Sequence, residues 1–153
     1  MNRNLIQILL ADDDKDDCLL FKDALDELPI SVELKTVYSG EQLMKLFNKN
    51  EELPDILFLD LNMPRKNGFQ CLTEIKENEK FKELPVIIFS TSFDRDIVNL
   101  LYKNGAHYCI RKPNQFSQLK KLLHRAILLT YEALPIDTAG NLIQPPRENF
   151  VIS

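Results

Sequence analysis

Short apolar runs alternate with amphipathic segments along this chain as far as residue 132. The runs are rich in branched residues, as in buried strands, whereas each amphipathic segment carries apolar residues at helical spacing. The runs predict strands at 6–11, 31–37, 55–59, 86–89 and 106–110. The amphipathic segments predict helices at 16–28, 40–50, 68–77, 94–104 and 117–132.

Strands that alternate with helices predict an α/β fold whose parallel sheet is covered on both faces. Because crossovers between parallel strands are right-handed, few topologies remain, and a doubly wound sheet is the natural one. In such sheets, ligands bind beyond the carboxyl ends of the strands. We therefore expect the functional residues at that edge.

The composition is that of a globular protein: 153 residues, 44% of them apolar, with a formal net charge of −4. This length predicts one domain with a real core, and the acidic excess argues against non-specific nucleic-acid binding. No apolar run approaches the roughly 18 residues of a membrane span, and residues 1–11 lack a secretory-signal pattern. Three cysteines without CxxC spacing favour buried thiols in a reducing compartment, so we predict a cytoplasmic protein.

Charged and hydroxyl-bearing residues stand at the ends of four predicted strands. They are Asp12 and Asp13 after the first strand, Asp60 after the third, Ser90 after the fourth and Lys112 after the fifth. Because these ends meet at one rim of a doubly wound sheet, we expect the side chains to lie close together.

Such a cluster is suited to phosphoryl transfer. Neighbouring carboxylates repel unless a cation is present, and Mg²⁺ accepts one or two carboxylates while leaving positions open for phosphate oxygens. An ammonium and a hydroxyl suit the remaining phosphate oxygens, and a carboxylate can itself attack phosphorus. The cluster therefore predicts Mg²⁺-assisted transfer onto an aspartate.

Each residue taken alone has a simpler interpretation. Acids are favoured in any first helical turn, and Ser90 could be an ordinary turn residue. Asp60 fits this interpretation less well, because an isolated carboxylate at the end of a buried strand is costly. The joint placement at four strand ends favours the functional interpretation.

Four segments closely resemble the receiver domains of bacterial response regulators. They are ILLADDD at 8–14, DILFLDLNMPRKNGF at 55–69, LPVIIFSTS at 84–92 and IRKP at 110–113. The resemblance extends over about residues 5–132 and implies a flavodoxin-like α/β fold. In that fold a five-stranded parallel sheet has the order 2-1-3-4-5, with helices on both faces.

The resemblance also implies a metal site. Asp60 matches the phosphoacceptor of the family, and Asp12 and Asp13 match the acidic pair that binds Mg²⁺ with it. Asn62 matches the position whose backbone carbonyl completes the metal shell. Mg²⁺ is therefore the expected cofactor.

Further matches concern the phosphoryl group. Ser90 matches the switch hydroxyl, Lys112 matches the lysine that pairs with the phosphoryl group, and Pro113 matches a proline whose preceding peptide bond is cis in the family. One position departs from the pattern: the usual aromatic residue three before the lysine is Cys109, and Tyr108 lies on the opposite strand face. This departure puts the family's coupling between hydroxyl and aromatic in question, but not phosphorylation itself.

The implied function is a signalling switch of a two-component system, in which a histidine kinase or histidine phosphotransfer protein phosphorylates Asp60. The DDDKDD opening and the STS after the fourth strand resemble the phytochrome-partner group. An alternative is a degenerate receiver that acts unphosphorylated as an interaction module. Phosphatases of the haloacid dehalogenase type need an acid where this chain has Asn62, so we expect no enzyme beyond slow self-dephosphorylation.

The expected organisation is a receiver domain at 1–132 and a tail at 133–153 with no output domain, so output would be by protein contact. The last helix continues its apolar stripe into Leu128, Leu129 and Tyr131, which exceeds what one sheet face needs. The tail adds Leu134, Ile136, Leu142, Ile143, Phe150, Val151 and Ile152. We therefore predict a homodimer through the last two helices and the tail, although a tail folded over its own receiver is the simpler alternative.

Overall fold

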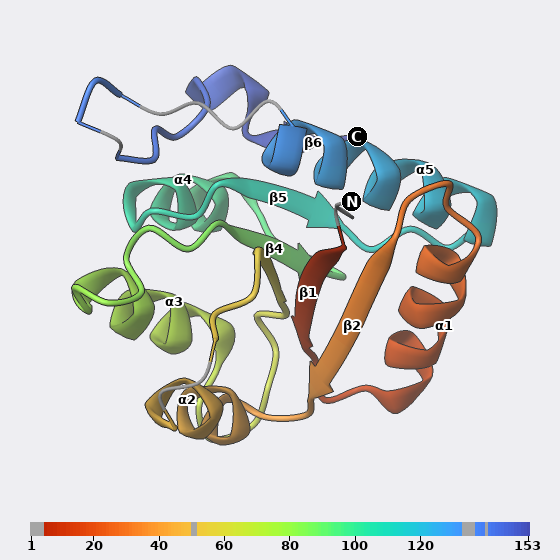
Figure 1. The fold of residues 1–153 in the computed structure, drawn as a ribbon, viewed down its shortest axis with the longest axis horizontal. Coiled ribbons are helices and arrows are strands. Elements are labelled where there is room, and N and C mark those ends of the chain that lie inside the picture. Colours follow the sequence, from red (N-terminus) through yellow and green to blue (C-terminus); the bar gives the residue numbers. More distant parts are fainter. Residues whose placement is uncertain (1–4, 50–51, 133–136, 140) are drawn as a thin grey trace.

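A parallel sheet lies between two layers of helices in the computed structural model, which describes residues 5–49, 52–132, 137–139 and 141–153 (Figure 1). The strand order is β2-β1-β3-β4-β5-β6. The strands are β1 (Ile6–Ala11), β2 (Val32–Val37), β3 (Ile56–Leu59), β4 (Val86–Ser90), β5 (Tyr108–Arg111) and β6 (Val151–Ile152). The predicted flavodoxin-like α/β fold is confirmed, with a sixth strand added at one edge.

The helices are α1 (Lys15–Asp26), α2 (Gly40–Asn48), α3 (Gly68–Glu77), α4 (Arg95–Lys103) and α5 (Phe116–Ile127). Four of them begin at a polar side chain that accepts a hydrogen bond from a first-turn backbone amide, which satisfies a donor the helix leaves free. These capping residues are Asp14, Ser39, Asn67 and Asp94. The first four helices lie within a few residues of their predicted ranges.

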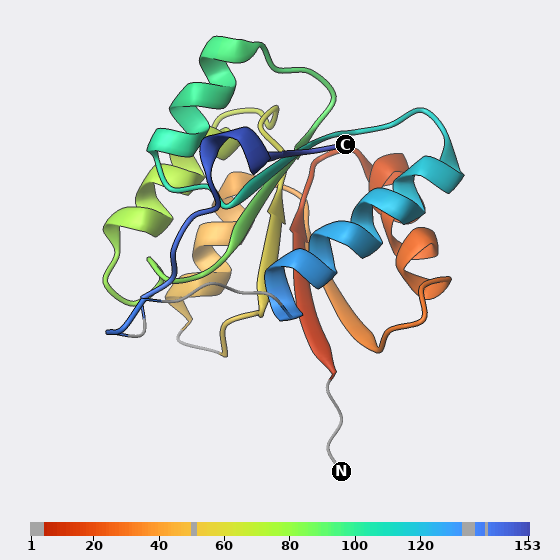
Figure 2. The same cartoon turned by 90° about the horizontal axis from the view of Figure 1, so that it is seen from above.

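Two apolar layers hold the helices to the sheet. Successive strand residues point to opposite faces, so Phe58 packs toward α1 and α5 whereas Leu57 and Leu59 pack toward the other helices. In Figure 2, α1 (orange) and α5 (blue) lie together on one side of the sheet, and α2, α3 and α4 lie on the other. Phe21 of α1 meets Phe58 edge to face, with ring centroids 5.0 Å apart.

The sixth strand corrects the prediction of a five-stranded sheet. The end of the predicted tail folds back as β6 beside β5, with Cys109 paired to Val151 and Ile110 to Ile152. Phe150 and Ile152 are buried in the molecule's own core. The free edge of β5 offered unpaired backbone groups, and the tail satisfies them. Leu134 and Ile136 lie outside the described residues.

The last helix differs from its prediction as well. The α-helix ends at Ile127, and a π-helical turn follows at Leu128–Glu132. In this wider turn Leu129 packs against the α1–α5 side of the core and Tyr131 is exposed. The continuous apolar stripe predicted to face a partner is therefore divided between the core and the surface.

Candidate functional site

The carboxyl ends of four neighbouring strands carry the predicted site residues, and the structure brings these residues together. Asp12 follows β1, Asp60 follows β3, Ser90 ends β4 and Lys112 follows β5. Asp12, Asp60 and Ser90 are buried, with relative exposures of 0%, 4% and 0%. Polar groups this deeply buried at adjacent strand ends are costly unless they pair with each other or with a ligand.

Asp60 is held by the backbone on both sides of it. Its amide donates a hydrogen bond of 2.9 Å to the Ala11 carbonyl, and its Oδ1 accepts one of 3.3 Å from the Asn62 amide. The start of α3 presses against it, since a Cβ on Gly68 would lie 2.2 Å from the Asp60 carbonyl oxygen. Only glycine allows this close approach, so Gly68 sets the position of Asp60.

Three carboxylates converge in a way that suits a divalent metal ion. Asp12, Asp13 and Asp60 each offer one oxygen, and these oxygens lie within 4.8 Å of one another. Hard cations such as Mg²⁺ prefer oxygen ligands of this kind. Burial raises the pKa of Asp12 to about 6, although its hydrogen bond with Lys112 opposes this shift. The predicted acidic residues therefore fit a metal ion.

Lys112 places its ammonium among three carboxylates. Its Nζ lies 2.7 Å from Oδ2 of Asp12, 2.9 Å from Oδ2 of Asp17 and 3.5 Å from Oδ2 of Asp60. Burial lowers the pKa of Lys112, but the hydrogen bonds to Asp12 and Asp17 outweigh it and leave the pKa above its usual value. Lys112 is therefore a positive charge in this site.

Asp17 is a site residue that the sequence analysis missed. It lies in the first turn of α1, where an acidic residue is ordinary, and nothing in its local pattern indicated a contact with Lys112. The two residues are 95 positions apart in the chain. The crossing of α1 and the loop after β5 at one rim brings them together.

Asn62 joins the ends of β3 and β4. Its Nδ2 donates a hydrogen bond of 3.2 Å to Oγ of Ser90, while its backbone amide serves Asp60. The role predicted for its backbone carbonyl stays a prediction. The side-chain contact was not predicted, because it depends on two strands brought side by side.

Cys109 and Tyr108 lie on opposite faces of β5, as predicted. Cys109 is fully buried on the α2–α4 side, and Tyr108 packs on the α1–α5 side. Phe150 from the tail packs in the same layer as Cys109, with its ring 5.1 Å from that of Tyr102 on α4. An aromatic ring from the tail therefore occupies the layer to which β5 contributes the buried Cys109 thiol.

The peptide bond before Pro113 differs from the family pattern. Residues 5–49, 52–132, 137–139 and 141–153 contain no cis peptide bond, so this bond is trans. The structure shows no reason for this difference.

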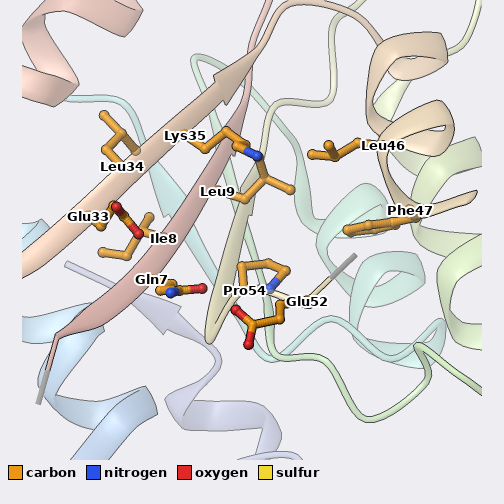
Figure 3. A pocket seen from close by; sticks show the side chains of 10 residues that line it. All are labelled: Gln7, Ile8, Leu9, Glu33, Leu34, Lys35, Leu46, Phe47, Glu52 and Pro54. Atoms are coloured by element: carbon orange, nitrogen blue, oxygen red, sulfur yellow. The ribbon is translucent and has the colours of Figure 1, made fainter. Parts of the chain in front are cut away.

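A pocket in the described part of the chain lies away from this cluster. It has a volume of about 600 Å³ and lies between β1, β2 and α2, where Leu46 and Phe47 face Leu9 and Lys35 across it (Figure 3). None of the residues predicted for the strand-end site lines it. The convergence of charged groups, and not this pocket, marks the candidate site.

Comparison with known proteins agrees with this geometry. The family model described as the response regulator receiver domain matches residues 8–124, which is most of the chain. The chain belongs to the response regulator receiver family. In this receiver domain, the matched range contains every residue of the strand-end cluster.

Particular relatives of the receiver are response regulators, one of which is named as a phytochrome response regulator. Response regulator Rcp1 of Synechocystis sp. is 31% identical over 121 residues, covering 76% of this chain and 82% of that protein. The solved Mn²⁺-bound form of Rcp1 matches with a TM-score of 0.76 at 28% identity, covering 87% of this chain and 99% of that one. The phosphorylated cyanobacterial phytochrome response regulator RcpA matches with a TM-score of 0.75 at 29% identity, covering 90% and 98%. The predicted resemblance to the phytochrome-partner group is therefore confirmed.

No helix in the part of the receiver that the structure describes is long and apolar enough to cross a membrane.

Proposed function

We propose that this receiver is a phosphorylation-activated switch whose Asp60 accepts a phosphoryl group from a histidine kinase or a histidine phosphotransfer protein. The observation that carries the proposal is the meeting of Asp60 with two further carboxylates and the Lys112 ammonium. The Ser90 hydroxyl lies at the neighbouring strand end. This combination supplies a nucleophile, a metal site and partners for phosphoryl oxygens.

In the proposed transfer, one oxygen of the Asp60 carboxylate attacks the phosphorus of a phosphohistidine. The new O–P bond forms as the N–P bond of the donor breaks, and the donor imidazole leaves with that electron pair and takes a proton from water. The Asn62 amide orients the Asp60 carboxylate through Oδ1. Pre-orientation of the nucleophile lowers the entropic part of the barrier.

The three carboxylates suit Mg²⁺, which Asp12, Asp13 and Asp60 would hold together with the Asn62 backbone carbonyl. When bound, Mg²⁺ supplies positive charge that screens the approaching phosphoryl oxygens. Lys112 contributes a second positive charge, because its ammonium nitrogen lies 3.5 Å from a carboxylate oxygen of Asp60. The protein's own part is thus to assemble the charges in advance.

We infer that Ser90 and Lys112 carry the change from the phosphorylated site to the rest of the molecule. The Ser90 oxygen accepts from Asn62, so its own proton is available to donate to a phosphoryl oxygen. Ordering of these groups around the phosphoryl group would favour one of two conformations. Residues 1–132 would act as the switch, and output would be by protein contact.

The decisive test uses acetyl phosphate as donor and beryllofluoride as phosphoryl analogue. We expect acid-labile phosphorylation of the wild type in the presence of Mg²⁺, and none of the Asp60→Asn variant. Full labelling of that variant would reject Asp60 as the acceptor. An unchanged spectrum and unchanged stability with Mg²⁺ and beryllofluoride would favour the degenerate interaction module.

We also propose that the receiver forms a homodimer through its last two helices and the tail. Exposed apolar side chains lie on α4, at Ile97 and Leu100, and on the tail, at Ile143 and Val151, and a second copy related by a twofold axis can cover them. Light scattering at micromolar concentration should give a dimer, and Val151→Asp should weaken it. A monomer both with and without beryllofluoride would contradict the proposal.

The proposed cellular compartment rests on the state of the cysteine thiols and on the proposed phosphoryl donor. All three cysteines are free and buried, which fits a reducing environment. We therefore propose the cytoplasm as the place of phosphoryl transfer.

A further inference from the structure

Among the described residues, the Lys112 ammonium has one carboxylate partner that is not among the three converging carboxylates of Asp12, Asp13 and Asp60. Asp12 and Asp60 belong to the carboxylates that converge on a metal ion, whereas Asp17 does not. Yet Asp17 lies 2.9 Å from the ammonium, almost as close as Asp12 at 2.7 Å. Its side chain is 30% exposed, so it approaches Lys112 from the rim of the site.

The charges explain why such a partner matters. A divalent cation on Asp12 and Asp60 would compete with Lys112 for both carboxylates and would repel the ammonium. Asp17 would then be the carboxylate still free to hold Lys112. A phosphoryl group on Asp60 would in turn compete with Asp17 for the same ammonium.

We propose that Asp17 is a positioning residue for phosphoryl transfer, a role that rests on the proposed function of Asp60. It competes with Asp12 for the Lys112 ammonium, so that a metal ion displaces Lys112 from the metal carboxylates more easily. It also retains the ammonium until a phosphoryl group on Asp60 takes it over. Asp17 therefore favours metal binding and opposes capture of the phosphoryl group.

The simpler interpretation is a surface ion pair without a role in the site. Exposed pairs contribute little, so this interpretation predicts no change in either binding reaction when Asp17 is replaced. A general effect of negative charge also predicts weaker Mg²⁺ binding and tighter beryllofluoride binding, but it predicts these changes for the neighbouring Asp16 as well. Only the positioning role predicts them for Asp17 alone.

The test compares Asp17→Asn with Asp16→Asn, which removes the same charge from the neighbouring exposed position of α1. Mg²⁺ affinity is measured by calorimetry, and beryllofluoride affinity at saturating Mg²⁺ by the amide resonances of Asn62 and Ser90. In Asp17→Asn we expect the Mg²⁺ dissociation constant to rise about threefold to tenfold and the beryllofluoride midpoint to fall by a similar factor. In Asp16→Asn both should stay within about twofold.

A second variant guards against a folding defect. Asp17→Glu keeps the charge and should return both affinities toward the wild type, and circular dichroism checks that each variant is folded. Unchanged affinities in Asp17→Asn, or changes in the same direction, would overturn the positioning role while leaving the proposed function intact. A wild type that binds neither Mg²⁺ nor beryllofluoride would overturn both.

Discussion

The Cys109 amide donates a hydrogen bond of 3.0 Å to the carbonyl of Phe150, and this bond attaches the end of the chain to the edge of the sheet. Around it, Gln144 donates to the carbonyls of Tyr102 and Ala106, and Arg147 donates to Asn99 on α4. The tail is therefore part of the folded receiver, packed against β5 and α4, as Figure 1 shows.

This relationship predicts a local effect of Phe150→Ala. The Phe150 ring is fully buried, and a large-to-small change at such a site costs about 3–5 kcal/mol. Because the tail joins the sheet at its outermost strand, we expect the loss to appear as local opening and not as global unfolding. Hydrogen exchange should show the Cys109 amide exchanging at least about tenfold faster. Val151→Ala, at an exposed neighbouring position, should leave this amide protected, and equal exchange in both variants would contradict the prediction.

Gly68 predicts a link between the start of α3 and Asp60, the proposed phosphoacceptor. A methyl group there would lie 2.2 Å from the Asp60 carbonyl oxygen, so Gly68→Ala must displace the backbone at Asp60. We expect a loss of stability of about 1–3 kcal/mol together with a loss of phosphorylation by acetyl phosphate. Gly105→Ala is the control, because Gly105 has a φ of 97° but precedes β5 at the opposite rim. It should lose stability and keep phosphorylation.

Metal binding predicts a specific stabilisation. Mg²⁺ at ten times its dissociation constant should stabilise the fold by about 1.4 kcal/mol, which raises the melting temperature by roughly 3–6 °C. Asp12→Asn and Asp60→Asn should lose this increase, whereas Asp23→Asn, on the exposed side of α1, should keep it. Differential scanning calorimetry with and without Mg²⁺ measures the shift. An increase retained in Asp12→Asn would reject the proposed ligand set.

His107 predicts how stability depends on pH. Burial, aided by the charge of Lys76, lowers its pKa to about 3, and within the described ranges neither ring nitrogen has a hydrogen-bond partner. The unfolded chain therefore binds a proton below about pH 6.5 that the folded protein does not, so stability is lost as the pH falls through that value. The loss should be about 2 kcal/mol between pH 6.5 and 5, at about 1.4 kcal/mol per pH unit. Urea unfolding of His107→Leu should show this loss removed, and a parallel decrease in both proteins would contradict the assignment.

The sequence by itself determined the order of the elements and the contents of the strand ends. Apolar periodicity and helix caps are local properties, so β1, α3 and the residues that follow each strand could be assigned from short windows. The right-handed crossover rule then brought Asp12, Asp60, Ser90 and Lys112 to one rim without coordinates.

Only the tertiary structure decided the contacts that join distant segments. Three contacts depend on the relative placement of the elements. They are the ion pair of Asp17 with Lys112, the hydrogen bond from the Asn62 side-chain amide to the Ser90 hydroxyl, and the pairing of β6 with β5. The π-helical turn that follows α5 also depends on tertiary packing, because it is there that Leu129 packs against the core. A local sequence pattern carries no information about a partner 95 residues away, because that contact forms only when α1 and the loop after β5 are both packed on the sheet.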